Sequence, residues 1–478
     1  MNARFRHCVS IASLSAFVAC ATNPATGKKQ LMLVSEGQEA AMGKEADEQF
    51  HGLYGDFPNR ELQAYVESVG RPLAAASERP ALPWTFRVVD DAQVNAFALP
   101  GGYVYVTRGI LAHMNSEAEL AAVLGHEIGH VTARHSASAQ SKQLLGTVGL
   151  GVGMILSPTL RQGGDTLSQA FGLVFLKFGR DQESQADQLG LRYIARKDYN
   201  PQEMLDVFRM LDGVNTAAGG ERLPNWLSTH PAPPNRLADM KKSIQEQGIT
   251  GTRVGRPEFI RQLDGMVFGE NPREGFFREQ SFYHPEMAFR MVFPRGWETQ
   301  NERQAVSSIS SAKDAIVQLA LAQGEPEVAA NAFARQQGVQ AGSIERGDVN
   351  GSFAASLEFQ VQDQQNAVLQ GIVTFVKHGT NTFQLLGYAP QPRYSAYRST
   401  FAAWIRSFSR LTDQRILSVR PMELRIETLR SAATIAGLAR DWNSPVKPEA
   451  LALINGVSLT ESIPAGSTVK RVVGEKVQ

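Results

Sequence analysis

The sequence predicts a mainly α-helical domain with a small β-sheet, followed by an α+β domain and then a small module of strands and helices. Apolar residues recur at helical spacing through most of residues 36–248. After a break at residues 251–257, which contains Gly251, Gly255 and Pro257, several segments alternate between apolar and polar residues. A length of 478 residues is too great for one ordinary core, so several domains are expected.

The first twenty residues have the pattern of a bacterial lipoprotein-type signal peptide. Two arginines precede an apolar stretch, residues 8–19, that is too short to span a bilayer as a mature helix. The stretch ends with Phe17-Val18-Ala19-Cys20, which resembles a lipobox, so lipidation of Cys20 is expected. A plain cleaved signal and an uncleaved anchor are the alternatives. Residues 21–35 predict a tether, and the expected location is the periplasm, on a lipid anchor in the outer membrane.

Composition and charge exclude several classes of protein. Hydrophobic residues make up 43% and charged residues 20%, which is typical of folded globular chains. A net charge of +1 without long single-sign runs gives no reason to expect nucleic acid as a partner. Cys8 and Cys20 are the only cysteines, so a mature chain without its signal is expected to have no internal disulfide. No later segment reaches the 18 consecutive apolar residues of a membrane helix.

The first domain is expected at residues 36–250. Helical spacing predicts a helix within residues 36–76, and residues 85–89 and 95–107 predict strands, with Gly101-Gly102 as a turn. The α+β domain is expected at 251–411. Its predicted strands are 287–293, 315–322, 352–361, 367–376 and 382–386, its predicted helices are 327–337 and 393–411, and His378 is expected in a hairpin turn.

The module expected at residues 412–478 has two short helical patterns between terminal strands, and Asn455-Gly456 marks a turn. This order resembles a LysM module, whose strand-helix-helix-strand unit often binds the glycan chains of peptidoglycan. The resemblance makes peptidoglycan a candidate partner.

Residues 116–135 contain the pattern that carries chemistry, His126-Glu127-Ile128-Gly129-His130. Ser116 and Glu119 predict a capping box, which places this pattern inside a helix. Because His126 and His130 are four residues apart, both imidazoles lie on one helix face and can bind one cation. Glu127 projects about 100° round the axis from His126, where it can act on a metal-activated water without joining the ligands.

Catalytic zinc usually has three protein ligands, so a third is needed. Glu183 and Asp187 are four apart on a second predicted helix. One carboxylate can complete the ligand set while the other accepts the free N–H of a ligating histidine. An exposed, solvated helix face is the alternative interpretation of this pair.

These motifs resemble those of the zinc metallopeptidases that include HtpX and the CAAX prenyl proteases. The Glu183-x-x-x-Asp187 pattern, the string Asn95-Ala-Phe-Ala-Leu-Pro-Gly-Gly before it and the string His230-Pro-Ala-Pro-Pro-Asn-Arg236 after it all occur in order. The lipoprotein-like start makes the chain most similar to the periplasmic, BepA-like branch.

The resemblance implies a zincin-type metallopeptidase domain that holds one Zn²⁺ per chain, with Glu183 as the third ligand and Asp187 as its neighbour. It also implies that Asn95, Ala96, Phe97 and Ala98 begin an edge strand on which substrate lies. An edge strand offers unpaired backbone groups to an extended peptide, whereas an ordinary core hairpin is the alternative.

Histidine in the position of His230 lies near the metal in this family, as a switchable ligand or as an aid to the charged intermediate. A catalytic role for His230 is therefore expected, against an ordinary loop residue, and Arg236 is expected to orient the loop. Arg134 and His135 are expected to be structural or solvent-facing.

The expected function is a zinc-dependent endopeptidase of the cell envelope that acts on unfolded or misassembled envelope proteins. The alternative is a chaperone-like or peptidoglycan-binding lipoprotein whose metal site is latent.

Overall fold

The structure is a computed structural model that describes residues 20–55, 57–147, 178–217, 226, 229–231, 235–362 and 367–476. The predicted signal peptide and the side chain of Cys20 lie outside the described residues, so the lipidation of Cys20 stays a prediction.

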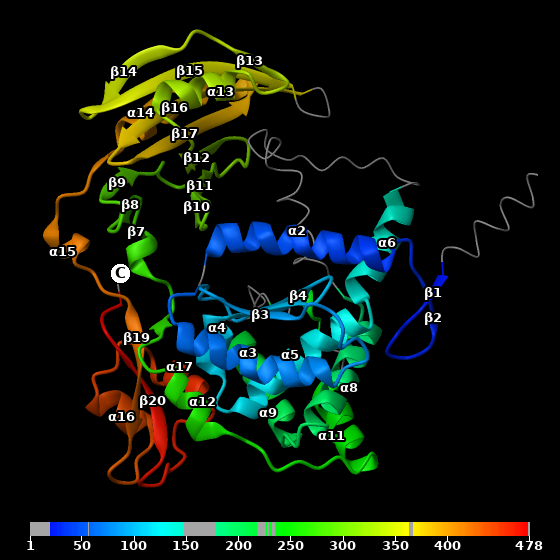
Figure 1. Cartoon of the computed structure of the whole chain (residues 1–478). Coiled ribbons are helices and arrows are strands. Elements are labelled where there is room, and N and C mark those ends of the chain that lie inside the picture. The colour runs from blue at the N-terminus through cyan, green and yellow to red at the C-terminus, as the bar shows by residue number, and fades with distance from the viewer. Residues whose placement is uncertain are drawn as a thin grey trace, which may run out of the picture. The chain divides into compact units, whose positions relative to one another are not determined.

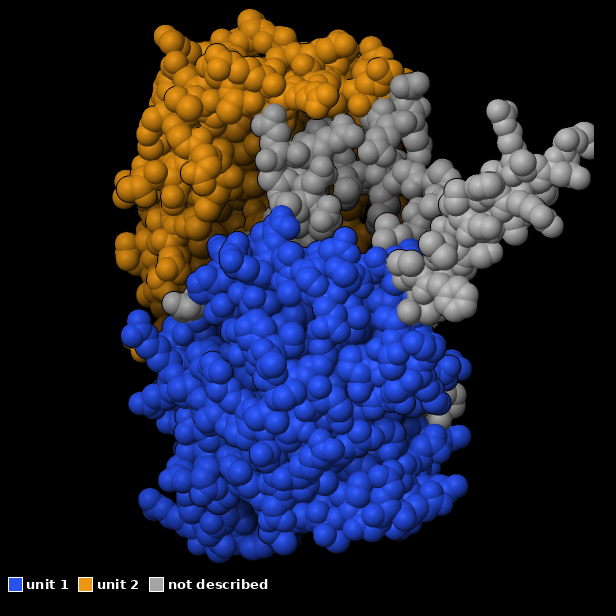
Figure 2. All heavy atoms as spheres, turned by 45° about the vertical axis from the view of Figure 1, so that its right-hand side comes forward, with its two compact units in different colours: residues 1–151, 165–270, 422–474 blue, residues 152–164, 271–421, 475–478 orange. Residues whose placement is uncertain are grey.

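The chain divides into two compact units, which Figure 2 distinguishes by colour. The first unit holds residues 1–151, 165–270 and 422–474, and the second holds 152–164, 271–421 and 475–478. This grouping differs from the sequence-based division, because residues 251–270 and the C-terminal strands and helices join the first unit.

A small sheet lies at the centre of the first unit (Figure 1). β3 (Thr85–Val89) runs parallel to β5 (Tyr103–Thr107), and β5 pairs antiparallel with β4 (Ala96–Leu99), so β3 and β4 are its edges. β4 and β5 are joined through Gly101 and Gly102, whose φ angles of 85° and 105° glycine adopts without strain. The predicted strands and their turn are confirmed.

Helices cover both faces of this sheet. Phe50 of α2 (Glu36–Tyr54) packs on one face, and α3 (Arg60–Ala75) and α5 (Glu117–Thr132) belong to the large core on the other. Asn59 caps α3 by accepting hydrogen bonds from two backbone N–H groups, so the helical pattern of residues 36–76 forms two helices. The other helices described in residues 76–270 are α4 (Arg108–His113), α6 (His135–Thr147), α8 (Arg180–Ala195), α9 (Gln202–Ala217), α11 (Arg236–Glu246) and α12 (Arg256–Gln262).

The segment predicted as a tether is folded in part. β1 (Cys20–Thr22) and β2 (Lys29–Leu31) form an antiparallel hairpin. The buried Asn23 amide closes its turn and donates to the carbonyl of Ala133 at 3.2 Å, which ties the hairpin to the end of α5. The prediction of a free linker missed these long-range contacts.

The C-terminal part of the first unit has the predicted strand-helix-helix-strand order. It consists of β19 (Met422–Thr428), α16 (Ile435–Asp441), α17 (Pro448–Asn455) and β20 (Thr468–Val473), and β19 also pairs with β6 (Val267–Phe268). Its likeness to a LysM module stays a prediction.

Lys470 ties this C-terminal part to the segment before α5. Its ammonium group is fully buried and donates to the carbonyls of Ala112 and Met114 at 2.8 and 2.6 Å. Burial lowers the pKa of Lys470 to about 7. These contacts help to explain why the C-terminal part, residues 422–474, packs into the first unit.

The second unit has a large antiparallel sheet with one helix on each face. Phe401 and Trp404 of α14 (Gln391–Arg406) contribute to the core on one face, and Phe333 of α13 (Pro326–Ala334) contributes to the core on the other. The strand order within the described residues is β10 (Glu298–Asn301), β11 (Ala305–Ile309), β12 (Ile316–Ala322), β17 (Asn381–Pro390), β16 (Val368–His378), β15 (Ser352–Gln362) and β13 (Val339–Ala341), with β14 (Glu345–Val349) also pairing with β15.

A smaller sheet completes the second unit, and its described strands are β7 (Phe276–Arg278), β8 (Ser281–His284), β9 (Phe289–Val292) and β18 (Ser409–Arg410). The short helices are η2 (Pro272–Glu274) and α15 (Gln414–Leu417). His378 lies at the predicted hairpin between β16 and β17, and it is not part of the group of possible metal ligands found in the described part of the chain. Among the described helices, none combines the length and apolarity needed to cross a membrane.

Candidate metal centre

The local sequence fixes where α5 begins. Ser116 lies at its N-cap and accepts a hydrogen bond from the Glu119 N–H at 3.0 Å. The carboxylate of Glu119 accepts from the N–H of Asn115 at 2.6 Å, one residue earlier than the predicted capping box requires. The helix therefore starts where the sequence predicts, and its last two turns carry His126 and His130.

The structure brings the two imidazoles and Glu183 together. The Nε2 atoms of His126 and His130 are 3.0 Å apart. Each lies 3.5 Å from a carboxylate oxygen of Glu183, which comes from α8. All three side chains are buried, and His230 completes a group whose ligand atoms lie within 4.8 Å of one another.

Glycines allow α8 to approach α5 closely enough for this meeting. A Cβ on Gly190 would lie 2.9 Å from the backbone nitrogen of His126, and a Cβ on Gly129 would lie 3.0 Å from the carbonyl oxygen of Ala186. A side chain at Gly190 would force the backbone to shift, and one at Gly129 would make an unusually tight contact, so the glycine within the His-Glu-x-x-His pattern has a packing role.

Asp187 and Arg236 orient His126. The Nδ1 of His126 lies 2.9 Å from a carboxylate oxygen of Asp187, and Arg236 donates two hydrogen bonds to the same carboxylate at 2.8 and 2.6 Å. Burial opposes the ionisation of Asp187, but the Arg236 guanidinium and His126 together outweigh it and hold the pKa of this carboxyl below its usual value. An ionised Asp187 accepts a hydrogen bond from the Nδ1–H of His126, which leaves the Nε2 lone pair of the ring facing Glu183.

His135 is buried rather than solvent-facing, with 1% of its surface exposed. Its Nδ1 lies 2.9 Å from the Nδ1 of His130, and its Nε2 lies 2.7 Å from the amide oxygen of Gln185. Gln185 was absent from the sequence-based candidates, because a glutamine between two carboxylates on a helix carries no distinctive signal.

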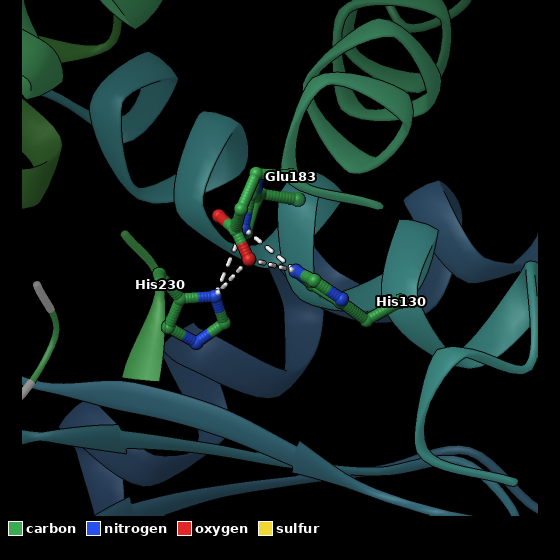
Figure 3. A group of neighbouring side chains, drawn as sticks. His130, Glu183 and His230 are labelled. Atoms are coloured by element: carbon green, nitrogen blue, oxygen red, sulfur yellow. Dashed lines mark hydrogen bonds and ion pairs between the residues drawn. The ribbon is translucent and has the colours of Figure 1, made fainter. Parts of the chain in front are cut away.

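His230 points into the cluster (Figure 3). Its Nδ1 lies 3.1 Å from Glu183 Oε1, and its Nε2 lies 3.8 Å from Glu127 Oε1. Burial alone would lower the pKa of His230, but the carboxylates of Glu183 and Glu127 outweigh it and raise this pKa. The ring also stacks on Trp226, with centroids 4.5 Å apart.

Glu127 is fully buried, and neither carboxylate oxygen has a hydrogen-bond partner. Burial raises the pKa of this carboxyl above its usual value. A buried carboxyl group without hydrogen bonds is costly to the fold, and such groups are concentrated at functional sites.

The residues fit a zinc ion. Zinc binds imidazole nitrogen at about 2.0 to 2.1 Å and carboxylate oxygen at similar distances, so ligands at the corners of a tetrahedron lie about 3.3 Å apart. The separations of 3.0, 3.5 and 3.5 Å among His126, His130 and Glu183 are close to this value. Glu183 also has a buried carboxylate oxygen without a hydrogen-bond partner, and a cation would satisfy it.

The predicted substrate strand occupies an edge of the small sheet. Asn95 precedes β4, which includes Ala96, Phe97 and Ala98 and contacts α5. These side chains are buried, and Phe97 stacks on Tyr105 with ring centroids 4.7 Å apart. The buried side-chain oxygen of Asn95 has no hydrogen-bond partner. Binding of substrate along this edge stays a prediction.

A His-Glu-x-x-His helix packed on a second helix that adds a glutamate defines the class of zinc metallopeptidases. Comparison with protein-family models identifies the family: the model of peptidase family M48 matches residues 60–244. The chain belongs to this family, as the sequence-based resemblance predicted.

Curated relatives agree with this assignment. The chain is 38% identical over 160 residues to the mitochondrial metalloendopeptidase OMA1 of Arabidopsis thaliana, which covers 33% of this chain and 31% of that protein. It is 29% identical over 235 residues to the beta-barrel assembly-enhancing protease of Escherichia coli, covering 47% of each chain. It is 30% identical over 232 residues to OMA1 of Schizosaccharomyces pombe, covering 47% of this chain and 67% of that protein. The chain thus spans less than half the length of the first two relatives.

Proposed function

We propose that this chain is a zinc-dependent endopeptidase of the cell envelope that takes part in the quality control of misfolded or outer-membrane proteins. The observation that carries the proposal is the buried convergence of His126, His130 and Glu183 beside the unpartnered carboxylate of Glu127. Membership of peptidase family M48 supports it.

In the proposed mechanism, His126, His130 and Glu183 would hold the zinc ion. The ion, when bound, supplies activation of water and polarisation of the scissile carbonyl. Glu127 accepts the proton of the attacking water and delivers it to the leaving amine. His230, next to Glu127, donates a hydrogen bond to the oxyanion of the substrate, or serves as a further ligand before substrate binds.

The edge strand β4 supports a preference for extended or unfolded chains. A substrate that pairs with its free backbone groups is held largely regardless of its side chains. Because one relative is a beta-barrel assembly-enhancing protease, misassembled outer-membrane β-barrels are the proposed substrates. A lipid on Cys20 would hold the enzyme at the outer membrane, and the C-terminal segment of residues 422–474 would bind peptidoglycan.

The test compares purified wild-type chain with variants at the centre. Wild type should hold one zinc per chain and cleave casein and an unfolded outer-membrane β-barrel protein, and a chelator should abolish both cleavages. Glu127→Gln should keep zinc and lose about 10²- to 10⁴-fold in cleavage rate, because only the proton acceptor is removed. His126→Ala and His130→Ala should lose both zinc and cleavage. Glu258→Gln, at an exposed position of α12, is the matched control. Normal cleavage by Glu127→Gln would falsify the assignment.

A second candidate is a chaperone-like lipoprotein whose metal site is latent. The observation that favours it is the depth of the site, since Glu127 and Glu183 have no exposed surface and His230 has 1%. Stoichiometric zinc without turnover of any unfolded substrate would support this candidate over the protease.

A further inference from the structure

His126 and His130 of α5 each have a hydrogen-bond partner at the Nδ1 atom, and the two partners differ in kind. The Nδ1 of His126 contacts Asp187, as the resemblance implied. Among the described residues, the partner of the His130 Nδ1 is not a carboxylate but the Nδ1 of His135, at 2.9 Å.

The positions of the protons follow from the end of this chain of contacts. The amide oxygen of Gln185 only accepts hydrogen bonds, so the Nε2 of His135, 2.7 Å away, carries a proton. A neutral imidazole has one N–H, and the Nδ1 of His135 is then an acceptor. The Nδ1 of His130 must donate to it, which leaves the Nε2 lone pair of His130 facing Glu183.

The opposite arrangement would disable the site. If Gln185 presented its NH₂ group to His135, each ring would shift its proton by one nitrogen, and the Nε2 of His130 would carry a hydrogen. A protonated Nε2 has no lone pair for a cation. The orientation of one amide on α8 is therefore coupled, through His135, to the tautomer of a ring on α5.

We propose that His135 and Gln185 are positioning residues that fix the tautomer and orientation of His130 for metal binding. This inference rests on the proposed zinc function. Phe178 supports it, because its ring stacks on His130 with centroids 4.1 Å apart and limits rotation of the imidazole. One helix, α8, thus carries Glu183, the Asp187 partner of His126 and the Gln185 anchor of His135.

The test measures zinc affinity by competition with a chromophoric chelator, in His135→Ala and His135→Asn. The oxygen of an asparagine can occupy the position of the histidine Nδ1 and accept from His130, whereas alanine cannot. Loss of a partner of this kind lowers metal affinity about 10- to 100-fold. His135→Ala should fall in this range, and His135→Asn should recover most of the loss.

The control for the loss of an imidazole is His113→Ala, at a partly buried position. His113 lies on α4 in the same unit, and its Nδ1 contacts the backbone carbonyl of Gly109 at 2.7 Å, away from the metal cluster. A general loss of stability would affect His113→Ala and His135→Ala alike. The absorption spectrum of the Co²⁺-substituted protein gives a second readout, and it should change in His135→Ala but not in His113→Ala.

Two glutamine variants on α8, Gln185→Ala and its control Gln188→Ala, test the contact between Gln185 and His135. Gln185→Ala should lower zinc affinity by several-fold, because His135 is no longer held to one tautomer. Gln188→Ala removes a similar side chain that bonds Ser243 and should leave zinc affinity unchanged.

The outcomes separate this inference from the proposed function. If wild type binds zinc and cleaves casein, but His135→Ala binds zinc as tightly as His113→Ala, the positioning role is wrong while the protease stands. If His135→Asn is no better than His135→Ala, the acceptor role of the Nδ1 is wrong. A wild-type chain without zinc would overturn both.

Discussion

Asp187→Asn removes one charge from the centre and keeps the shape of the side chain. In the wild type, one carboxylate oxygen contacts His126 Nδ1 at 2.9 Å and Arg236 at 2.6 Å, while the other accepts from the Arg236 Nε at 2.8 Å. An asparagine has only one acceptor oxygen. Whichever way the amide is turned, its NH₂ group faces a donor, either the guanidinium of Arg236 or the N–H of His126.

The magnitude follows from the burial of both partners. Arg236 is 8% exposed and Asp187 2%, so the substitution removes the nearest counter-ion of a buried guanidinium and leaves it only Glu183, whose carboxylate oxygen is 4.0 Å away. Removal of one partner of a buried pair costs about 3 to 5 kcal/mol. Loss of the histidine's orienting acceptor lowers zinc affinity about 10- to 100-fold, which corresponds to about 1.4 to 2.7 kcal/mol.

Two measurements check this prediction. Hydrogen exchange of the α5 amides in metal-free protein reports the loss of stability, and chelator competition reports zinc affinity. Asp206→Asn is the control, because Asp206 pairs with Arg209 on an exposed helix surface, where such a pair contributes about 0 to 1 kcal/mol. If Asp187→Asn and Asp206→Asn behave alike in both assays, the Arg236-Asp187 clamp does not support the metal centre.

Three further predictions concern packing, pH and the C-terminal segment. Gly190→Ala should push α8 away from α5, destabilise the unit by about 1 to 3 kcal/mol and weaken zinc binding, which thermal unfolding and chelator competition would show; unchanged values would refute the packing argument. Burial lowers the pKa of His113 to about 4 from 6.5, so the unfolded chain binds more protons between these values. In metal-free protein, His113 should therefore contribute a loss of about 3 kcal/mol as pH falls from 6.5 to 4, and His113→Gln should lose that much less than wild type. A chain that ends at Pro421 should show early melting of the first unit in calorimetry, because β6 loses its partner strand and core side chains become exposed; an unchanged melting temperature would contradict this.

The sequence predicted the elements whose signals are local. The Ser116 cap, the spacing of His126 and His130 and the glycine turn at Gly101 all depend on neighbours within a few residues, and the structure contains each of them. The predicted division of the chain differs from the structure at its C-terminal end. Lys470 contacts the carbonyl of Ala112, more than 350 positions earlier in the chain, and no local pattern indicates that a lysine is buried there.

The candidate site also contains residues that a local sequence pattern identifies and residues that it does not. Carboxylates four residues apart on a helix have a recognisable spacing, so Glu183 and Asp187 were identified with their partners still open. Gln185 lies between them, and its partner His135 lies fifty positions away on another helix, so neither residue has a spacing that indicates the contact. Ligand types are constrained by the chemistry of the ion, whereas the groups that hold a ligand's second nitrogen need only be acceptors.

Because any acceptor can hold the Nδ1 of a ligating histidine, His126 and His130 can have different partners there. His126 faces an ionised carboxylate that Arg236 keeps charged, and His130 faces a neutral imidazole fixed by an amide. If His130 also faced a carboxylate, the site would bury four carboxylates: that one, Asp187, Glu183 and Glu127. Their negative charge would exceed the positive charge of the Arg236 guanidinium and one divalent cation. A neutral relay through His135 and Gln185 orients His130 without adding a charge, so replacing Gln185 with glutamate should destabilise the metal-free protein more than Gln185→Ala does. Equal stability of the two variants would show that charge does not limit the choice of support at this position.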